Sequence, residues 1–100
     1  MDAITPDELR ARKTDLKVFD IRKDPDDRRI PGSLQAEGAA LEGEEDLPFG
    51  KDDDVVLYCG SGNSCSRIAK TLRDRGYRAV ALEGGYRAWV DAGFPTEERS

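Results

Sequence analysis

The sequence has no histidine and only two cysteines, Cys59 and Cys65, among its 100 residues. Two thiols six positions apart are not the disulfide framework of a small secreted domain. They also cannot complete a structural zinc site, which takes four Cys or His ligands, so we expect no metal ion and no other cofactor. Because no imidazole is available, a cysteine nucleophile in this chain cannot use the Cys–His pair of a cysteine protease.

The chain also has no excess of basic residues and no long apolar run. Its formal net charge is −5, and it lacks the basic stripe that neutralises nucleic-acid phosphates. No apolar stretch is long enough to span a membrane, and the N-terminus lacks the basic start of a signal peptide. We therefore expect a cytoplasmic protein that binds neither nucleic acid nor membranes. Apolar residues make up 37% of the sequence, which suffices for the core of one domain over residues 1–100.

Helices and strands alternate along the predicted fold. Thr5 and Glu8 form a capping box, which predicts a helix from Pro6 to about Lys13. The apolar, β-branched run at 54–58 is typical of a buried parallel strand. The alternation indicates an α/β fold with a parallel sheet and helices on its faces. The remaining predicted elements are strands at 16–21 and 78–82, helices at 64–75 and 86–92, a short helix around 39–41, a polar loop at 22–29 and turns at 30–32 and 83–85.

The segment from Cys59 onward carries the chemistry, because it joins the buried strand to the helix at 64–75. In a parallel α/β sheet, ligands bind where the strands end, and the following helix points its N-terminus back at that place. Glycines in the segment allow successive N–H groups to converge on one anion. Such donors stabilise a thiolate and lower a cysteine pKa from about 8.5, which we expect at Cys59. We assign Cys59 as the catalytic residue and, as the substrate-binding loop, Gly60, Ser61, Gly62, Asn63 and Ser64.

A persulfide on Cys59, Cys–S–S⁻, is stabilised by the same backbone donors without any side-chain acid or base. The absence of histidine therefore favours sulfur transfer over hydrolysis. The alternative is an inert cysteine chosen for its size at a strand end, since free cysteine is often buried. The glycine-rich context between a strand and a helix favours the functional interpretation.

Four segments in a fixed order carry a resemblance to a known family. The strand with Asp20 and Arg22 resembles the family's Asp-x-Arg signature, and residues 30–33 resemble its Ile-Pro-Gly-Ala/Ser turn. Residues 57–64 match its active-site loop, and residues 82–89 match its closing Gly-Gly-x-x-x-Trp motif. On these motifs the chain is similar to a single rhodanese domain over nearly its whole length.

The resemblance implies a rhodanese-like parallel five-stranded sheet flanked by helices on both faces. It also implies a sulfurtransferase of the thiosulfate:cyanide type, in which Cys59 accepts a sulfane sulfur from a small-molecule donor such as thiosulfate. The sulfur then passes to cyanide, to a thiol or to a protein acceptor. Related phosphatases and arsenate reductases use a longer loop, Cys-x₅-Arg. Cys65 stands at the position of that arginine, which argues against a phosphatase.

The active-site loop departs from the family pattern in its charge. Many members have Arg or Lys in the loop, where this chain has Gly60 and Ser64. The loop therefore offers backbone donors and hydroxyls but no fixed cation, and we expect thiosulfate to bind weakly. Residues 59–62 also resemble the start of the mercaptopyruvate sulfurtransferase loop, which leaves that activity as an alternative.

Several further residues are candidates for supporting roles. Cys65 shares the apolar face of its helix with Ile68, Ala69 and Leu72 and is expected in the core, although it could also resolve a persulfide or sulfenate on Cys59. Asp20 and Arg22 are expected to be structural, through bracing of the loops and pairing with a nearby acid, with direct contact to the substrate as the alternative for Arg22. Trp89 is expected to anchor the last helix.

Two other functions remain open. A rhodanese-fold module could bind a partner protein without catalysis, and Cys59 and Cys65 together could form a redox sensor. The retention of Cys59 in an intact loop favours sulfur transfer over the first of these.

Overall fold

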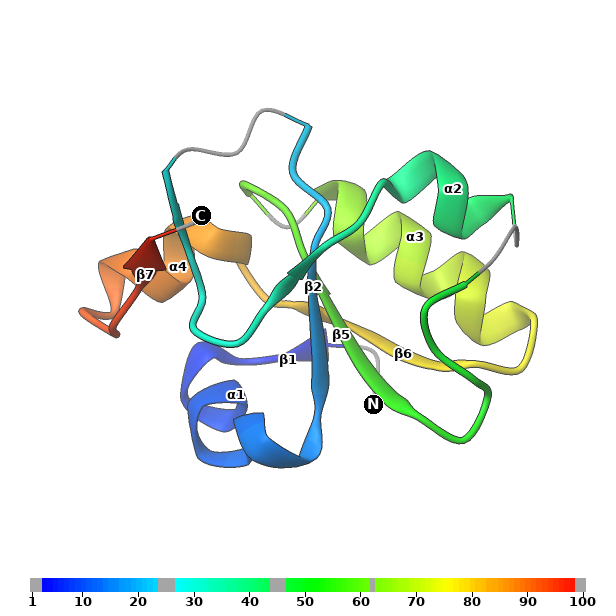
Figure 1. Cartoon of the computed structure of the whole chain (residues 1–100), viewed down its shortest axis with the longest axis horizontal. Helices are drawn as coiled ribbons and strands as arrows, with labels where there is room; N and C mark the ends of the chain where they lie inside the picture. Colours follow the sequence, from blue (N-terminus) through cyan, green and yellow to red (C-terminus); the bar gives the residue numbers. More distant parts are fainter. Residues whose placement is uncertain (1–2, 24–26, 44–46, 62, 99–100) are drawn as a thin grey trace.

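The computed structural model describes residues 3–23, 27–43, 47–61 and 63–98, and a five-stranded sheet lies at its centre (Figure 1). The strands are β1 (Ala3–Ile4), β2 (Lys17–Asp20), β4 (Leu34–Gln35), β5 (Asp54–Tyr58) and β6 (Arg78–Leu82). Their order is β1-β6-β5-β2-β4, and every neighbouring pair is parallel. Asp20 lies opposite Tyr58 in the β2–β5 register, so these two strands end at the same edge of the sheet.

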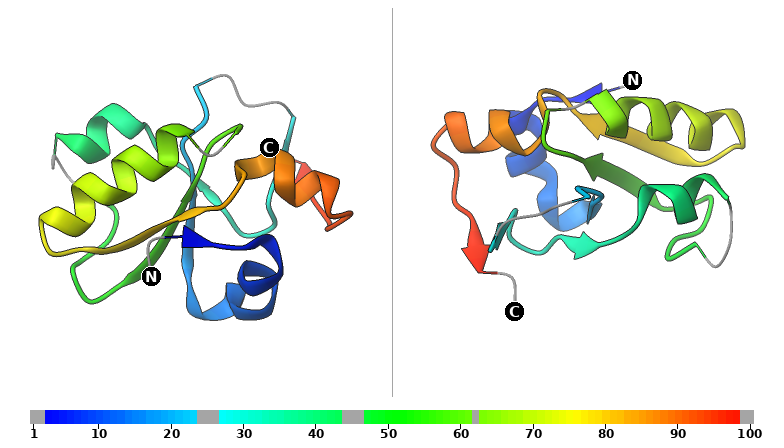
Figure 2. Two further views of the ribbon diagram at one scale, coloured as in Figure 1. Left: turned by 180° about the vertical axis from the view of Figure 1, so that it is seen from behind. Right: turned by 90° about the horizontal axis from the view of Figure 1, so that it is seen from above.

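Helices cover both faces of the sheet. They are α1 (Pro6–Arg12), continued by the 3₁₀ turn η1 (Lys13–Asp15), α2 (Gly38–Glu42), α3 (Asn63–Asp74) and α4 (Gly85–Asp91). Figures 1 and 2 show α2 and α3 together on one side and α1 and α4 on the other. The alternation of side chains along β5 explains this arrangement. Val55 and Leu57 pack in the core beneath α2 and α3, whereas Val56 and Tyr58 pack in the core beneath α1 and α4.

Most of the predicted elements are confirmed, including the parallel sheet and the helices. The capping box forms as predicted: the Thr5 N–H donates to Glu8 Oε1 and the Glu8 N–H donates to Thr5 Oγ1, each at 3.1 Å. The hydrogen bond from the Thr5 backbone also lowers the pKa of Glu8. In α3 the predicted apolar face is buried, and Gly76 follows the helix with a positive φ of 95°.

The sequence pattern misses the short strands. The predicted polar loop at 22–29 is wrong at its end, because β3 (Arg28–Arg29) pairs antiparallel with β7 (Glu97–Glu98). The partner strand is distant in sequence, and two-residue strands contain no periodicity that a local pattern could reveal. An ion pair of 2.7 Å between Arg29 Nε and Glu97 Oε2 joins the two segments. Residues 24–26 of that loop lie outside the described residues.

A buried hydroxyl ties β5 to the turn at residues 30–33. The Ile30 N–H donates to Tyr58 Oη at 3.2 Å, and Ser33 Oγ lies 2.8 Å from the same atom. Ile30, Ser33 and Tyr58 are all fully buried. Burial raises the pKa of Tyr58 to about 12, so the phenol stays protonated at neutral pH. The Ile-Pro-Gly-Ser segment is therefore held against the sheet by buried hydrogen bonds.

We expect Tyr58→Phe to lower the free energy of unfolding by about 1–3 kcal/mol, because a buried N–H and a buried hydroxyl lose their partner. In a domain of this size, the loss corresponds to a fall in Tm of about 5 °C or more. Thermal unfolding followed by circular dichroism measures the change. Tyr77→Phe is the matched control, since the Tyr77 hydroxyl has no hydrogen bond within the described part of the chain. Equal Tm values for the two variants would contradict the prediction.

Candidate active site

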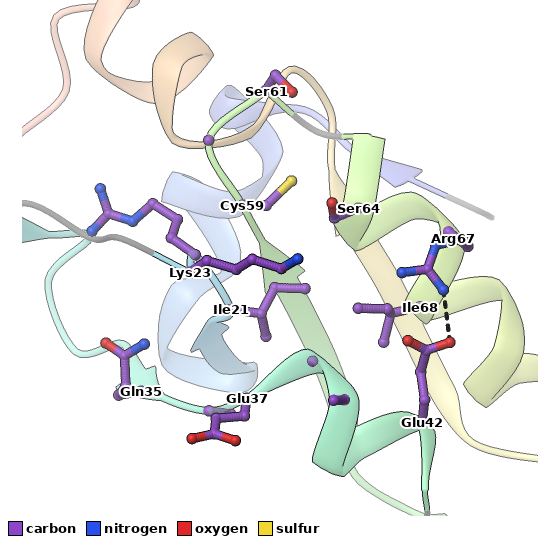
Figure 3. A pocket seen from close by; sticks show the side chains of 15 residues that line it. Ile21, Lys23, Gln35, Glu37, Glu42, Cys59, Ser61, Ser64, Arg67 and Ile68 are labelled. Carbon is purple, nitrogen blue, oxygen red and sulfur yellow. Dashed lines mark hydrogen bonds and ion pairs between the residues drawn. The ribbon is translucent and has the colours of Figure 1, made fainter.

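Cys59 directly follows β5 at the carboxyl edge of the sheet and borders a cleft of about 730 Å³ (Figure 3). The active-site loop and α3 form one wall of the cleft, and the segment that leads into α2 forms another. Ile21 and Ile68 contribute apolar surface between them. Cys59 is only 6% exposed, so its thiol is largely shielded from bulk water. Clefts of roughly 300–1,000 Å³ hold small-molecule ligands.

The first turn of α3 supplies a hydrogen-bond donor to the thiol. The Cys65 N–H donates to Cys59 Sγ over 3.4 Å. Because α3 begins at Asn63, this N–H belongs to the first turn, which has no carbonyl partner within the helix. The helix N-terminus also carries partial positive charge, which favours an anion such as a thiolate or a persulfide at Sγ.

The N-terminus of α4 fixes the other side of the same loop. The Tyr86 N–H donates to the Cys59 carbonyl at 2.7 Å, and the Arg87 N–H donates to the Gly60 carbonyl at 3.1 Å. Gly84 and Gly85 bring these donors into place with φ values of 75° and 66°, a region that favours glycine. A Cβ on Gly84 would lie 2.5 Å from the Ala88 side chain. The Gly-Gly motif therefore positions the backbone of Cys59 and Gly60 through α4.

Asp20 and Arg22 form a buried ion pair at the end of β2. The distance from Arg22 Nη2 to Asp20 Oδ2 is 2.7 Å, and Arg22 Nε lies 3.0 and 3.1 Å from the two carboxylate oxygens. Arg22 Nη2 also donates to the Arg28 carbonyl at 2.7 Å, and the guanidinium lies 4.1 Å above the Tyr86 ring. The Asp-x-Arg motif thus connects β2 to β3 and to α4, which fits the structural role expected for both residues.

Cys65 is fully buried in the core beneath α2 and α3, as the apolar face predicted. A side-chain hydrogen bond with Cys59, and secondly burial, raise the pKa of Cys65 above its ordinary value. Cys65 therefore remains a protonated thiol at neutral pH. The two sulfur atoms belong to one site, although only Cys59 borders the cleft.

The structure brings most of the predicted loop residues together at the cleft. Gly60, Ser61 and Ser64 line it beside Cys59, whereas Asn63 begins α3 with an exposed side chain. Gly62 lies outside the described residues. Trp89 is buried as expected, and its indole N–H donates to the Pro95 carbonyl at 2.8 Å.

Four charged residues at the cleft are absent from the site residues predicted from the sequence. Lys23 follows Arg22, Glu37 precedes α2, Glu42 ends α2, and Arg67 lies one turn into α3. Arg67 Nη1 lies 2.7 Å from Glu42 Oε2. The loop itself lacks a cation as predicted, but these cations reach the cleft from other segments. Arg67 follows Cys65 by two positions, so its side chain points away from the buried face of α3. This spacing is the one feature of the sequence that could have indicated a position outside the core.

Two further findings about the described residues concern membrane-spanning helices and metal-binding clusters. No helix among them is long and apolar enough to cross a membrane. The described part of the chain also contains no group of three or more His, Cys, Asp or Glu side chains arranged to hold a metal ion.

The chain belongs to the Rhodanese-like domain family, whose sequence profile matches residues 5–92. It is 44% identical over 46 residues to a protein named Sulfurtransferase from Allochromatium vinosum, across 45% of this chain and 43% of that protein. It is also 47% identical over 45 residues to the Arabidopsis thaliana protein named HIGH ARSENIC CONTENT 1, mitochondrial, across 44% of this chain and 27% of that protein. The chain thus matches less than half the length of both relatives.

Solved structures support the fold assignment. A rhodanese-related protein from Thermoplasma volcanium superimposes with a TM-score of 0.84 at 22% identity, over 97% of this chain and 98% of that chain. At this identity the likeness concerns the fold, and it agrees with the five-stranded parallel sheet described above.

The different surroundings of the two thiols predict selective alkylation. We expect iodoacetamide to modify Cys59 alone in the folded protein, because Cys65 is fully buried and its pKa is raised.

We expect Cys65→Ser to lower the free energy of unfolding by about 1–3 kcal/mol, since it places a hydroxyl in an apolar site, and to leave Cys59 reactive. Peptide mass spectrometry and thermal unfolding measure the two effects. Rapid modification of Cys65 in the native protein would contradict this description of the site.

Proposed function

We propose that this protein is a sulfurtransferase or persulfide carrier that moves a sulfane sulfur through Cys59. The observation that carries the proposal is the position of Cys59 Sγ, which accepts the N–H of Cys65 at the start of α3 and borders a cleft. Membership of the Rhodanese-like domain family and the likeness to a protein named Sulfurtransferase support it.

The proposed reaction has two steps that need no cofactor. With thiosulfate as donor, the Cys59 thiolate attacks the outer sulfur, the S–S bond of the donor breaks, and sulfite leaves with the electron pair. Cys59 then carries a persulfide anion. In the second step, cyanide or a thiolate attacks the terminal sulfur, and Cys59 leaves as a thiolate, which yields thiocyanate or a new persulfide.

The backbone of the site suits both steps because the negative charge moves by only one S–S bond, about 2 Å, between Cys59 Sγ and the outer sulfur of the persulfide. The N–H of Cys65 donates to Sγ, and the partial positive charge of the helix N-terminus favours the anion in either position. The hydrogen bonds from α4 to the carbonyls of Cys59 and Gly60 hold those oxygens in fixed positions. Fixed donors reorganise little during the reaction.

One observation favours a second candidate function. The hydrogen bond between the Cys59 and Cys65 side chains brings two thiols together, as a redox sensor would require. In that case an oxidant such as peroxide would convert Cys59 to a sulfenic acid, and Cys65 would displace water from it to form a disulfide. The complete burial of Cys65 favours sulfur transfer, in which Cys65 stays reduced.

Incubation with thiosulfate separates these candidates. We expect Cys59 to gain the mass of one sulfur atom, and we expect cyanide to remove it with release of thiocyanate. Cys59→Ser should abolish both signals, whereas Cys65→Ser should retain them. Mass spectrometry of the intact protein and its peptides gives the readout. A protein without the adduct would support a binding module, and a Cys59–Cys65 disulfide after peroxide treatment would support a redox sensor.

The charge of the loop gives a second test. Gly60 has no positive φ of the kind that favours glycine, and a Cβ there meets no atom within 4 Å, so the position accepts a side chain. We expect Gly60→Arg to lower the KM for thiosulfate by about fivefold, because an exposed charge pair contributes at most about 1 kcal/mol. Gly60→Gln is the neutral control of similar length. Steady-state kinetics would refute the expectation if both variants changed KM equally.

A further inference from the structure

The cleft contains positive charge that does not come from the active-site loop. Lys23 and Arg67 both line the cleft that Cys59 borders, although they belong to the segment after β2 and to α3. Figure 3 shows the Lys23 side chain reaching into the cleft, toward the side where Arg67 lies. Two cations from distant segments thus converge on the space in front of the thiol.

Arg22 and Glu37 contribute little free charge to the cleft. Arg22 also lines the cleft, but its guanidinium is bound to the Asp20 carboxylate at 2.7 Å. Glu37 is exposed, and Figure 3 shows its carboxylate turned away from the middle of the cleft. Lys23 has no ion pair with any described residue. Among the three cations that line the cleft, Lys23 is thus the one that no described carboxylate neutralises.

Arg67 is held by an acid at the rim. Its Nη1 lies 2.7 Å from Glu42 Oε2, and the two side chains are 63% and 32% exposed. An exposed pair of this kind is weak and exchanges partners with ions in solution. Glu42 therefore reduces the attraction of the Arg67 charge for an incoming anion.

We propose that Lys23 and Arg67 bind the anionic group of the sulfur donor in place of the missing loop cation, and that Glu42 limits the strength of this binding. The assignment rests on Cys59 being the reacting group, as in the proposed function. It revises the expectation of weak thiosulfate binding, which considered only the charge of the active-site loop. It also makes Lys23 and Arg67 specificity-determining residues, since they favour anionic over neutral molecules near Cys59 through local electrostatic attraction.

A pair of matched alkylating agents tests this charge without any sulfur transfer. Iodoacetate is an anion and iodoacetamide is neutral, yet both react when the Cys59 thiolate attacks the same methylene carbon and iodide leaves. The ratio of their rates at Cys59, measured by peptide mass spectrometry, therefore reports the local potential and cancels changes in thiolate reactivity. Raising the salt concentration screens the charges and should bring the ratios of all variants together.

We expect Lys23→Gln to lower the iodoacetate-to-iodoacetamide ratio about threefold, and Glu42→Gln to raise it by a similar factor. Lys51→Gln is the matched control, because Lys51 precedes the amino end of β5 whereas Cys59 follows its carboxyl end. The length of the strand, about 16 Å, exceeds the screening length of about 8 Å at physiological salt. We therefore expect Lys51→Gln to leave the ratio unchanged.

The outcomes separate this inference from the proposed function. A ratio that is unchanged in Lys23→Gln, or lowered equally in Lys51→Gln, overturns the inference even if the wild-type protein transfers sulfur. A ratio that falls only in Lys23→Gln and rises in Glu42→Gln supports it, even if thiosulfate leaves no adduct on Cys59. Where transfer is measurable, the KM for thiosulfate should rise about threefold in Lys23→Gln, with kcat little changed.

Discussion

The hydrogen bonds that converge on the backbone and sulfur of Cys59 are the constraint on which the rest of the site depends. Three N–H groups from two helices meet there: Cys65 donates to Sγ, Tyr86 to the Cys59 carbonyl and Arg87 to the Gly60 carbonyl. They can meet because β5 lies between β2 and β6, so the helices that follow β5 and β6 begin at the same edge of the sheet. A parallel arrangement thus brings the N-termini of two helices to the segment that carries the thiol, α3 to the sulfur and α4 to the backbone carbonyls.

A second consequence of this arrangement concerns how charge is divided within the site. The Cys65 N–H donates to the sulfur, whereas the side-chain cations line the cleft from the segment after β2 and from α3. The Asp20–Arg22 pair uses one guanidinium to join β2, β3 and α4. In the proposed binding of the donor, Lys23 and the Glu42-paired Arg67 supply the charge instead. In the proposed function, one set of groups stabilises the sulfur anion and another recognises the molecule that brings it.

Local sequence predicted the helices, the longer strands and the thiol because each has a signal within a few residues. The capping box at Thr5 and Glu8, the apolar face of α3 and the run that forms β5 are of this kind. The pairing of Arg28 and Arg29 with Glu97 and Glu98 has no local signal, since the energy comes from contacts across most of the chain. The short strands were missed for that reason.

By itself the sequence determined that a cysteine ends a buried strand, that a glycine-containing loop follows it, and that no histidine or loop cation can assist. Only the tertiary structure decided which other groups reach that cysteine. Lys23 and Arg67 are surface residues in any local interpretation, and their presence at the cleft depends on the order of the strands and the packing of α2 against α3. Electrostatic attraction acts through space, so residues distant in the chain can share one ligand once the sheet has formed.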